Sequence, residues 1–371
     1  MTPFQKLGII YYLLPFIDVI DNRIGLLFSI LIGRKKMHLK VKGHGINFDA
    51  SKFQVMMAFM GVLMYCTSFK ITSDRKIELT LDLRNTFSIP LDNMSYEDQN
   101  LIETLFEGSR YGANFETSDI NFIDYRDKTL VITEQNGKKI IETSKGVKFY
   151  IDSIHPGNTI GEAFVMDIHT IRNQNDYTNK IVVDVGAECG DTPLYYASRG
   201  AKVYAFEPMK AHFDAMIRNL SLNPELAKRI IPINAAIGKD GMLKFYHSDQ
   251  ADIAGVSSFV YNAHGDDVIV FDDVQGYSLS SALVKFDIPH VDILKLDCKG
   301  CEFFIKQKDL EKVEQVKIEY EAFEYTKHNL NELTKVLDDS GFEYMIYRYN
   351  PTRDRFSNLV CGHLFGKKTN F

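Results

Sequence analysis

The residues best suited to chemistry lie where two apolar stretches of the sequence end. Gly186 and Gly190 follow the apolar run 181–185, and the acidic Glu207 follows the run 202–206. Glycines after a strand let a ligand approach the backbone closely, because no Cβ is in the way. A carboxylate after the second strand can accept hydrogen bonds from both hydroxyls of a ribose. The spacing therefore predicts a ligand that contains a nucleoside.

Two ligands with a nucleoside compete for this pattern, a dinucleotide and S-adenosylmethionine. A dinucleotide site usually has three close glycines around its pyrophosphate, whereas here the spacing is G-x-x-x-G. Asp191 follows directly, and its negative charge is a poor neighbour for a phosphate. A cofactor with sulfonium and ammonium groups tolerates acidic neighbours. We therefore favour the methyl donor and keep an NAD-dependent oxidoreductase on a Rossmann-like fold as the alternative.

A second group of reactive side chains follows the apolar run 291–296. Asp297 and Glu302 lie in or just after the loop at the end of that run, and they are our candidate general bases for a hydroxyl acceptor. The structural alternative is a buried carboxylate and a charge at a helix start. Cys298 and Cys301 lack the two further ligands of a zinc site, so we interpret them as small apolar residues and predict no metal.

The elements that must position these residues alternate between strand and helix after residue 178. Seven short runs are apolar and rich in β-branched or aromatic residues: 181–185, 202–206, 230–233, 291–296, 316–318, 344–347 and 359–365. Such alternation predicts an α/β fold, with a mostly parallel seven-stranded sheet and helices on both faces. The stretch 238–289 and a final, antiparallel pair of strands are expected to depart from simple βαβ form. Thr192 and Pro193 are predicted to start the helix after the glycine turn.

The first 115 residues are expected to form an α+β extension, and residues 116–371, with a core at 178–371, the catalytic domain. Apolar stretches at 7–16, 25–32 and 55–65 accompany a basic cluster, which comprises Arg34, Lys35, Lys36, Lys40 and Lys42. One interpretation is peripheral membrane contact through residues 7–42. The favoured one is packing on the catalytic domain or on a second subunit in a homodimer. Alternation at 77–83 predicts a half-buried strand, residues 94–115 a helix and linker, and Asn136-Gly137 a hairpin.

Composition narrows the class of protein. The chain has 371 residues, 45% hydrophobic and 25% charged, which is typical of a globular protein. A net charge of −6 that is spread along the chain argues against a nucleic-acid partner. Five irregularly spaced cysteines favour a reducing setting, so we expect a cytoplasmic protein that is either free or associated with a membrane.

The motifs in combination resemble the FkbM-type methyltransferases over about residues 160–366. These class I S-adenosylmethionine-dependent enzymes mostly methylate hydroxyls on sugars, polyketides or related metabolites. The matching text is Asp184-Val185-Gly186-Ala187 with Gly190-Asp191-Thr192, Ala205-Phe206-Glu207-Pro208, Asn219-Leu220 with Leu222-Asn223, Leu294-Lys295-Leu296-Asp297 with Gly300 and Glu302, and Gly161-Glu162-Ala163-Phe164 upstream.

The resemblance implies a full set of cofactor-binding residues. Gly186 and Gly190 would line the methionine end of the donor, Glu207 the ribose, and residues 234–236 the adenine, with Asp297 facing donor or acceptor. The set comprises Asp184, Gly186, Ala187, Glu188, Gly190, Asp191, Thr192, Phe206, Glu207, Pro208, Asn234, Ala235 and Ala236.

The resemblance also implies an activity, O-methylation of a hydroxyl on a saccharide, glycolipid or related metabolite, with a small-molecule or glycan acceptor. The chain departs from the family pattern at Glu188, where Asn is usual, and at Lys299, where an acidic residue is usual. These departures keep a non-catalytic methyltransferase-fold assembly module as a further alternative.

Overall fold

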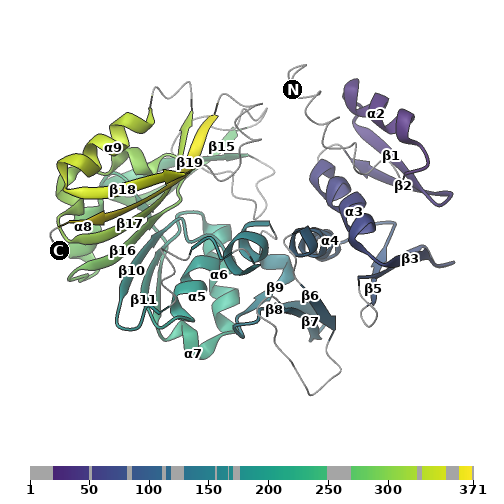
Figure 1. The fold of residues 1–371 in the computed structure, drawn as a ribbon, viewed down its shortest axis with the longest axis horizontal. Coiled ribbons are helices and arrows are strands. Elements are labelled where there is room, and N and C mark those ends of the chain that lie inside the picture. The colour runs from purple at the N-terminus through teal and green to yellow at the C-terminus, as the bar shows by residue number, and fades with distance from the viewer. Residues whose placement is uncertain are drawn as a thin grey trace. The chain divides into compact units, whose positions relative to one another are not determined.

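The structure is a computed structural model that describes most of the chain, in two compact units. The described residues are 20–49, 52–81, 86–110, 114–117, 129–154, 157–165, 167–169, 176–248, 269–323, 328–347 and 359–369. The units are Met1–Ile168 and His169–Phe371 (Figure 1). The boundary expected between residues 115 and 116 lies inside the first unit, and the expected core from residue 178 lies inside the second. The apolar stretch 7–16 lies outside the described residues.

The first unit begins with helices and short antiparallel sheets. Its elements are α2 (Arg23–Leu31), β1 (Lys36–Val41), β2 (His44–Asp49), α3 (Phe53–Tyr65), β3 (Ser68–Ile71), β4 (Lys76–Thr80), β5 (Thr86–Pro90) and α4 (Tyr96–Arg110). The apolar stretches 25–32 and 55–65 thus lie largely in helices. In β4, Ile77 and Leu79 are buried and Glu78 is partly exposed, so the predicted half-buried strand is confirmed. None of the helices among the described residues is long and apolar enough to cross a membrane.

A second sheet of the first unit has the order β6-β7-β8-β9. Its strands are β6 (Asn114–Thr117), β7 (Thr129–Gln135), β8 (Lys138–Glu142) and β9 (Lys148–Tyr150), followed by η3 (Ile151–Ser153) and η4 (Gly157–Val165). The predicted hairpin is confirmed, because Asn136 and Gly137 turn between β7 and β8 with φ of 52° and 72°. The predicted linker is corrected at its end, where β6 pairs with β7 in parallel.

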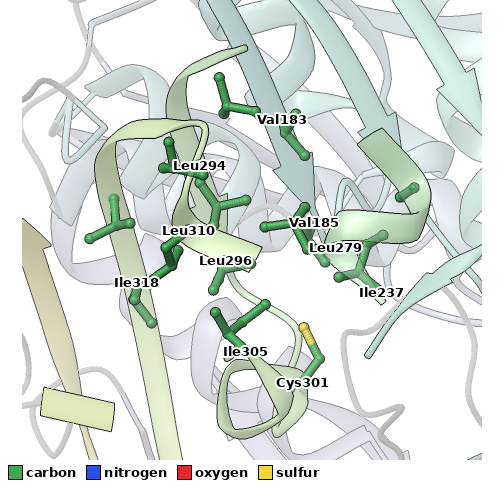
Figure 2. Close-up of a cluster of buried hydrophobic side chains, with 14 of the residues drawn as sticks. Val183, Val185, Ile237, Leu279, Leu294, Leu296, Cys301, Ile305, Leu310 and Ile318 are labelled. Atoms are coloured by element: carbon green, nitrogen blue, oxygen red, sulfur yellow. The ribbon is translucent and has the colours of Figure 1, made fainter. Parts of the chain in front are cut away.

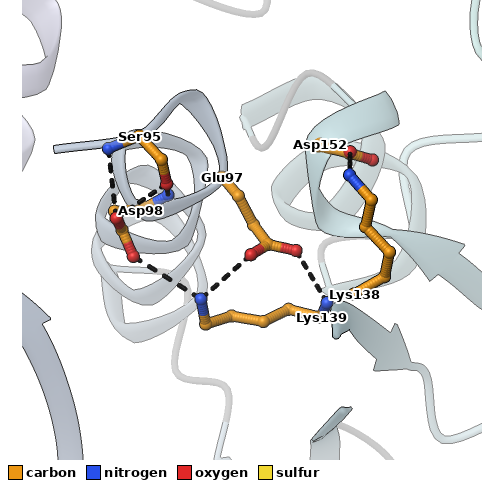
Figure 3. A network of polar contacts seen from close by, with 6 residues as sticks. All are labelled: Ser95, Glu97, Asp98, Lys138, Lys139 and Asp152. Carbon is orange, nitrogen blue, oxygen red and sulfur yellow. Dashed lines mark hydrogen bonds and ion pairs between the residues drawn. The ribbon is translucent and has the colours of Figure 1, made fainter. Parts of the chain in front are cut away.

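Ion pairs connect α4 to this hairpin (Figure 3). The Glu97 carboxylate accepts hydrogen bonds from the backbone N–H of Lys139 at 2.7 Å and from its Nζ at 3.0 Å. Asp98 lies 3.5 Å from the same Nζ, and Lys138 pairs with Asp152 at 2.8 Å. A backbone donor and an ammonium on one carboxylate fix the start of the helix against the second strand of the hairpin.

The second unit is built on a seven-stranded sheet with the order β12-β11-β10-β16-β17-β19-β18. The strands are β10 (Ile181–Val185), β11 (Lys202–Phe206), β12 (Ile230–Ile233), β16 (Val291–Leu296), β17 (Val313–Phe323), β18 (Phe342–Tyr347) and β19 (Leu359–Lys368). Five strands run parallel, and β19 is antiparallel to β17 and to β18. The predicted mostly parallel sheet with an antiparallel final pair is confirmed.

Helices cover this sheet, and a small sheet interrupts the alternation. The helices are α5 (Asp191–Ala197), α6 (Lys210–Ser221), α7 (Pro224–Ala227), α8 (Leu279–Lys285), η5 (Cys301–Phe304), η6 (Gln307–Leu310) and α9 (Leu330–Asp339). Figure 1 shows α5 and α7 on one side of the sheet and α8 and α9 on the other. The irregular stretch 238–289 contributes to the sheet β13-β15-β14, formed by β13 (Ala236–Ile237), β14 (Gly241–Ser248) and β15 (Ile269–Tyr277). Residues 249–268 of this stretch lie outside the described residues.

The main hydrophobic core lies against the central strands (Figure 2). Val183 and Val185 of β10 pack with Leu294 and Leu296 of β16, and each is at most 3% exposed. A fully buried side chain of this size contributes about 1.5 to 3 kcal/mol. The core therefore holds the carboxyl ends of β10 and β16 side by side, and the loops that leave them start from fixed positions.

Candidate functional site

The glycine turn after β10 is shaped by the chain's own packing. Gly186 has φ of +79°, and a Cβ there would lie 1.9 Å from the backbone oxygen of Asp297. A Cβ on Gly190, where φ is +87°, would lie 2.9 Å from Cγ of Met216. Backbone cannot move aside as a flexible side chain can. Glycine is therefore required at 186 by the neighbouring loop, whether or not a ligand also approaches there.

The helix after this turn starts two residues earlier than predicted, since Thr192 was expected as its N-cap and Pro193 as its first residue. α5 begins at Asp191 with left-handed Gly190 as its N-cap, so Thr192 is not the cap. The left-handed conformation of Gly190 turns the chain directly into the helix. Asp191 is then in the first turn, where its negative charge interacts favourably with the positive end of the helix dipole. The Thr192 hydroxyl instead donates a hydrogen bond to Asp184. Asp184 is fully buried, and this hydrogen bond joins the end of β10 to the first turn of α5.

Glu207, after β11, joins the first two loops. Its Oε2 accepts a hydrogen bond from the Glu188 backbone N–H at 2.9 Å, and its Oε1 accepts one from the Met209 N–H at the same distance. Each carboxylate oxygen has a second lone pair, so ribose hydroxyls could still donate to Glu207. Asn234 Nδ2 donates to the backbone oxygens of Glu207 and Pro208 at 2.8 and 3.0 Å, which fixes this turn.

Two acidic side chains of the glycine turn, Glu188 and Asp191, repel each other. Oε1 of Glu188 is buried and, within the described part of the chain, has no hydrogen-bond partner. Burial, and then the charge of Glu188, raise the pKa of Asp191 to about 7. Like charges that are buried together are unfavourable unless a cation joins them. The loop is therefore suited to a positively charged ligand.

A charged row crosses the centre of the sheet from this turn. Strand register aligns Asp184 of β10 with Lys295 of β16, and Lys295 with Lys317 of β17. Lys295 Nζ lies 3.1 Å from Asp184 Oδ1 and 3.7 Å from Asp297 Oδ2, and it donates to the Gly186 backbone oxygen at 3.0 Å. Burial lowers the pKa of Lys295, but the charges of Asp184 and Asp297 outweigh it and raise that pKa. Lys295 thus stays protonated and ties the two loops together.

Lys317 has a different environment from its neighbour. It is 2% exposed, and its Nζ hydrogen-bonds to Nδ1 of His169. Burial and the adjacent Lys295 charge lower the pKa of Lys317 to about 7. His363, on the paired β19, is 2% exposed and lies in the core. Sequence reasoning missed Lys295, Lys317 and His169, although a lysine inside each of two apolar strands was a signal.

Asp297 is the partly open carboxylate of the site. Its side chain is 33% exposed, and its backbone N–H donates to the Val185 oxygen at 3.0 Å. Burial raises the pKa of Asp297, but the positive charges of Lys295 and Lys299 outweigh it and lower that pKa. The departure at Lys299 therefore adds positive potential around Asp297 and helps to keep it ionised.

Glu302 and the two cysteines shape the loop that follows. Glu302 is fully buried, and its Oε2 accepts a hydrogen bond from the Gly300 N–H at 2.8 Å. The interpretation of Cys298 and Cys301 as merely small apolar residues is wrong, because their sulfur atoms form a disulfide. The atoms of Cys298, Cys301 and Glu302 that could ligate a metal ion lie within 4.8 Å of one another. The two sulfur atoms are joined in the disulfide, so they are not thiolate ligands. The expectation of no metal stays a prediction.

The predicted cofactor residues occupy adjoining loops. Those that follow β10, β11 and β12 meet at the same sheet edge, where Gly186 N–H and Ala187 N–H donate to the Phe206 oxygen at 3.0 and 3.1 Å. Nine members of the set are buried: Asp184, Ala187, Gly190, Asp191, Thr192, Phe206, Glu207, Ala235 and Ala236. The structure brings the set together, and the individual ligand contacts stay predictions.

Part of the chain is similar to a known protein family. Residues 184–344 match the family model described as "Methyltransferase FkbM domain". No curated protein sequence matches the chain.

Three solved structures are similar in part. An FkbM methyltransferase from Methylobacillus flagellatus KT shares 12% identity and a TM-score of 0.35, covering 85% of this chain and 60% of that one. TYW2 of M. jannaschii in complex with AdoMet shares 14% identity and a TM-score of 0.32, covering 66% and 89%. The ribosomal protein L11 methylase of Lactobacillus delbrueckii subsp. bulgaricus shares 12% and 0.33, covering 68% and 94%.

Proposed function

We propose that residues 184–344, which match the methyltransferase FkbM domain, bind S-adenosylmethionine and methylate a hydroxyl of a saccharide, glycolipid or related metabolite. S-adenosylmethionine supplies a methyl group on a cationic sulfonium. The proposal concerns the donor, the acceptor and the residues that serve them. The observation that carries it is the ionised, partly exposed Asp297 beside the glycine turn.

The residues of the turn fit this cofactor. The buried Glu188 oxygen without a partner and the raised pKa of Asp191 suit the ammonium and sulfonium groups. Glu207, which retains lone pairs, suits the ribose. A pyrophosphate would instead meet the carboxylates of Glu188 and Asp191, which disfavours the alternative of an NAD-dependent oxidoreductase.

Asp297 would accept the proton of the acceptor hydroxyl. Asp297 is the residue directly after the central strand β16, and its backbone oxygen lies against Gly186 of the glycine turn. A base within hydrogen-bond reach of the hydroxyl contributes about 10²- to 10⁴-fold to such a reaction. Lys295 would orient Asp297 and keep it ionised, while Glu302, which is fully buried, would hold the Gly300 backbone. A catalytic role of Glu302 stays a prediction.

The test combines binding with transfer. Isothermal titration should detect binding of S-adenosylmethionine. Mass spectrometry of a panel of saccharides and glycolipids should reveal an acceptor that gains mass only when the donor is present. Asp297→Asn should lower kcat by roughly 10²- to 10⁴-fold with little change in donor affinity. Glu302→Gln should mainly lower the free energy of unfolding and change kcat little, because the glutamine side chain would be a weaker acceptor for the Gly300 N–H.

Asp287→Asn, an equal change at an exposed position of the same unit, is the matched control and should leave kcat unchanged. Binding of NAD without binding of S-adenosylmethionine or its demethylated product would overturn the assignment. If Asp297→Asn left transfer to a true acceptor unchanged, Asp297 would not be the base. Donor binding without transfer to any acceptor would favour the non-catalytic module.

A further inference from the structure

An apolar stripe lies on the outer face of α2 in the first unit. Ile24 is 85% exposed, Phe28 57% and Ile32 51%. The three residues are four positions apart, so they lie on one side of the helix and its C-cap. On the other side, Leu26 and Ile30 are 2% and 7% exposed. The helix thus has a core-facing side and an apolar outward side.

The helix is held firmly in this orientation. Asn22 Nδ2 donates to the His38 backbone oxygen at 2.7 Å, and the Lys40 N–H donates to Asn22 Oδ1 at 2.8 Å. The Asp21 N–H also donates to the Lys40 backbone oxygen at 2.7 Å. These bonds join the start of α2 to β1. The outward position of the stripe therefore follows from the fold of the hairpin and not from a loose terminus.

Cations follow the stripe directly in the chain. Arg34, Lys35, Lys36 and Lys40 are all exposed, and none of their side chains forms an ion pair or hydrogen bond with another described residue. In residues 20–49, six Lys or Arg and two Asp residues give a charge of +4, whereas the whole chain carries −6. Positive charge is thus concentrated in the segment that carries the apolar stripe and the strands that follow it.

We propose that this α2 surface, formed by Ile24, Phe28, Ile32 and the cations Arg34, Lys35, Lys36 and Lys40, docks onto an anionic lipid bilayer. Apolar side chains that enter the headgroup region and cations that meet acidic lipids reinforce each other at such a surface. A helix of nine residues is about 14 Å long, so it lies along the bilayer and does not cross it.

The charge argues against a second copy of the chain as the occupant. A two-fold symmetric dimer would place the same patch of both subunits face to face. Four cations on each side, which have no ion-pair partner among the described residues, would then repel across the interface. An anionic surface neutralises them instead. The proposal does not depend on the acceptor proposed above, since it concerns the first unit alone.

Flotation of the full chain with vesicles tests the proposal. The chain should bind vesicles of phosphatidylcholine mixed with phosphatidylserine, bind pure phosphatidylcholine weakly, and dissociate as salt is raised. The variant I24S/F28S/I32S and the variant R34Q/K35Q/K36Q should each bind the anionic vesicles about tenfold more weakly or worse.

Two matched variants control for general loss of apolar or positive surface. M242S/V284S/M345S changes three exposed apolar residues of the second unit, and K285Q/K308Q/K312Q changes three exposed lysines there. Both should keep wild-type vesicle binding. Circular dichroism and donor titration verify that every variant is folded.

Failure to bind anionic vesicles would overturn the proposal, and so would equal binding by the α2 variants and their controls. Light scattering supplies a further discriminating result. If the wild type were a dimer that I24S/F28S/I32S made monomeric, the stripe would be an interface between copies and the lipid assignment would be wrong. Loss of vesicle binding with intact donor binding and transfer would support the proposal.

Discussion

The loop after β10 and the loop after β16 leave neighbouring strands of one parallel sheet, yet their acidic residues have opposite surroundings. In the first loop, Glu188 has a buried oxygen without a partner in the described region, and the pKa of Asp191 is raised. In the second, the cations Lys295 and Lys299 lower the pKa of Asp297. In the first loop, burial and the repulsion between Glu188 and Asp191 outweigh the charge of Lys295, so a cationic ligand would relieve that repulsion. In the second loop, the cations already outweigh the effect of burial.

The difference assigns distinct tasks to two otherwise similar turns. Carboxylates that repel each other, as Glu188 and Asp191 do, favour binding of a cationic donor. A carboxylate that neighbouring cations keep ionised can accept a proton without first having to lose one. Lys295 contacts both loops, so the two tasks are physically coupled through one side chain.

The largest expected effect comes from forcing the loops apart. Gly186→Ala would place a Cβ 1.9 Å from the Asp297 oxygen, so we expect a loss of about 4 kcal/mol or more in the free energy of unfolding. Donor binding should be lost with it. Gly341→Ala is the control, because Gly341 also has a positive φ, +74°, but has no atom within 4 Å. It should cost only about 1 to 2 kcal/mol in denaturant titrations. Equal losses would mean that the contact between the loops is unimportant.

Removing the shared cation should have the next largest effect. Lys295→Met leaves Asp184 buried without its ion-pair partner, so we expect a loss of about 3 kcal/mol in stability. It should also raise the pKa of Asp297 and move the acid limb of the pH–rate profile upward. Adding Asp184→Asn to Lys295→Met should recover part of the stability. Additive losses in this double-mutant cycle would contradict the pairing.

Opening the disulfide should affect the second loop more weakly. Replacing Cys298 and Cys301 with Ser removes a cross-link around a short loop, which we expect to cost about 2 kcal/mol. Alkylation of the denatured protein should label two more thiols after reduction than before. The same variant should change kcat more than donor affinity, because the bond lies in the loop of Asp297. No increase in labelling would show that the thiols are free.

The smallest effect concerns the pH dependence of donor binding. A cationic donor stabilises the ionised form of Asp191, whose pKa is about 7 in the free protein, so binding releases a proton below that pH. Affinity should therefore rise as pH increases toward 7, by up to about tenfold per pH unit, and level off above it. Asp191→Asn should flatten this profile in calorimetric titrations. A profile that the substitution leaves unchanged would assign the linkage to another group.

Much of the second unit, and one hairpin of the first, could be predicted from local patterns. The bounds of β10, β11, β12 and β16 agree with the apolar runs, because parallel strands buried on both faces are nearly continuous in apolar residues. The Asn136-Gly137 turn followed from the two left-handed conformations that it requires. The meeting of the predicted site loops at one sheet edge followed from the parallel topology.

The sequence by itself therefore determined the seven-stranded sheet and the hairpin turn of the first unit. It also determined the placement of Gly186, Glu207 and Asp297 after strand ends. All of these depend on nearest neighbours in the chain. Only the tertiary structure decided which charges meet. Asp184, Lys295 and Lys317 come from three strands and are joined by register, which no local pattern encodes. The strict need for glycine at 186 likewise arises from a backbone oxygen more than a hundred residues away.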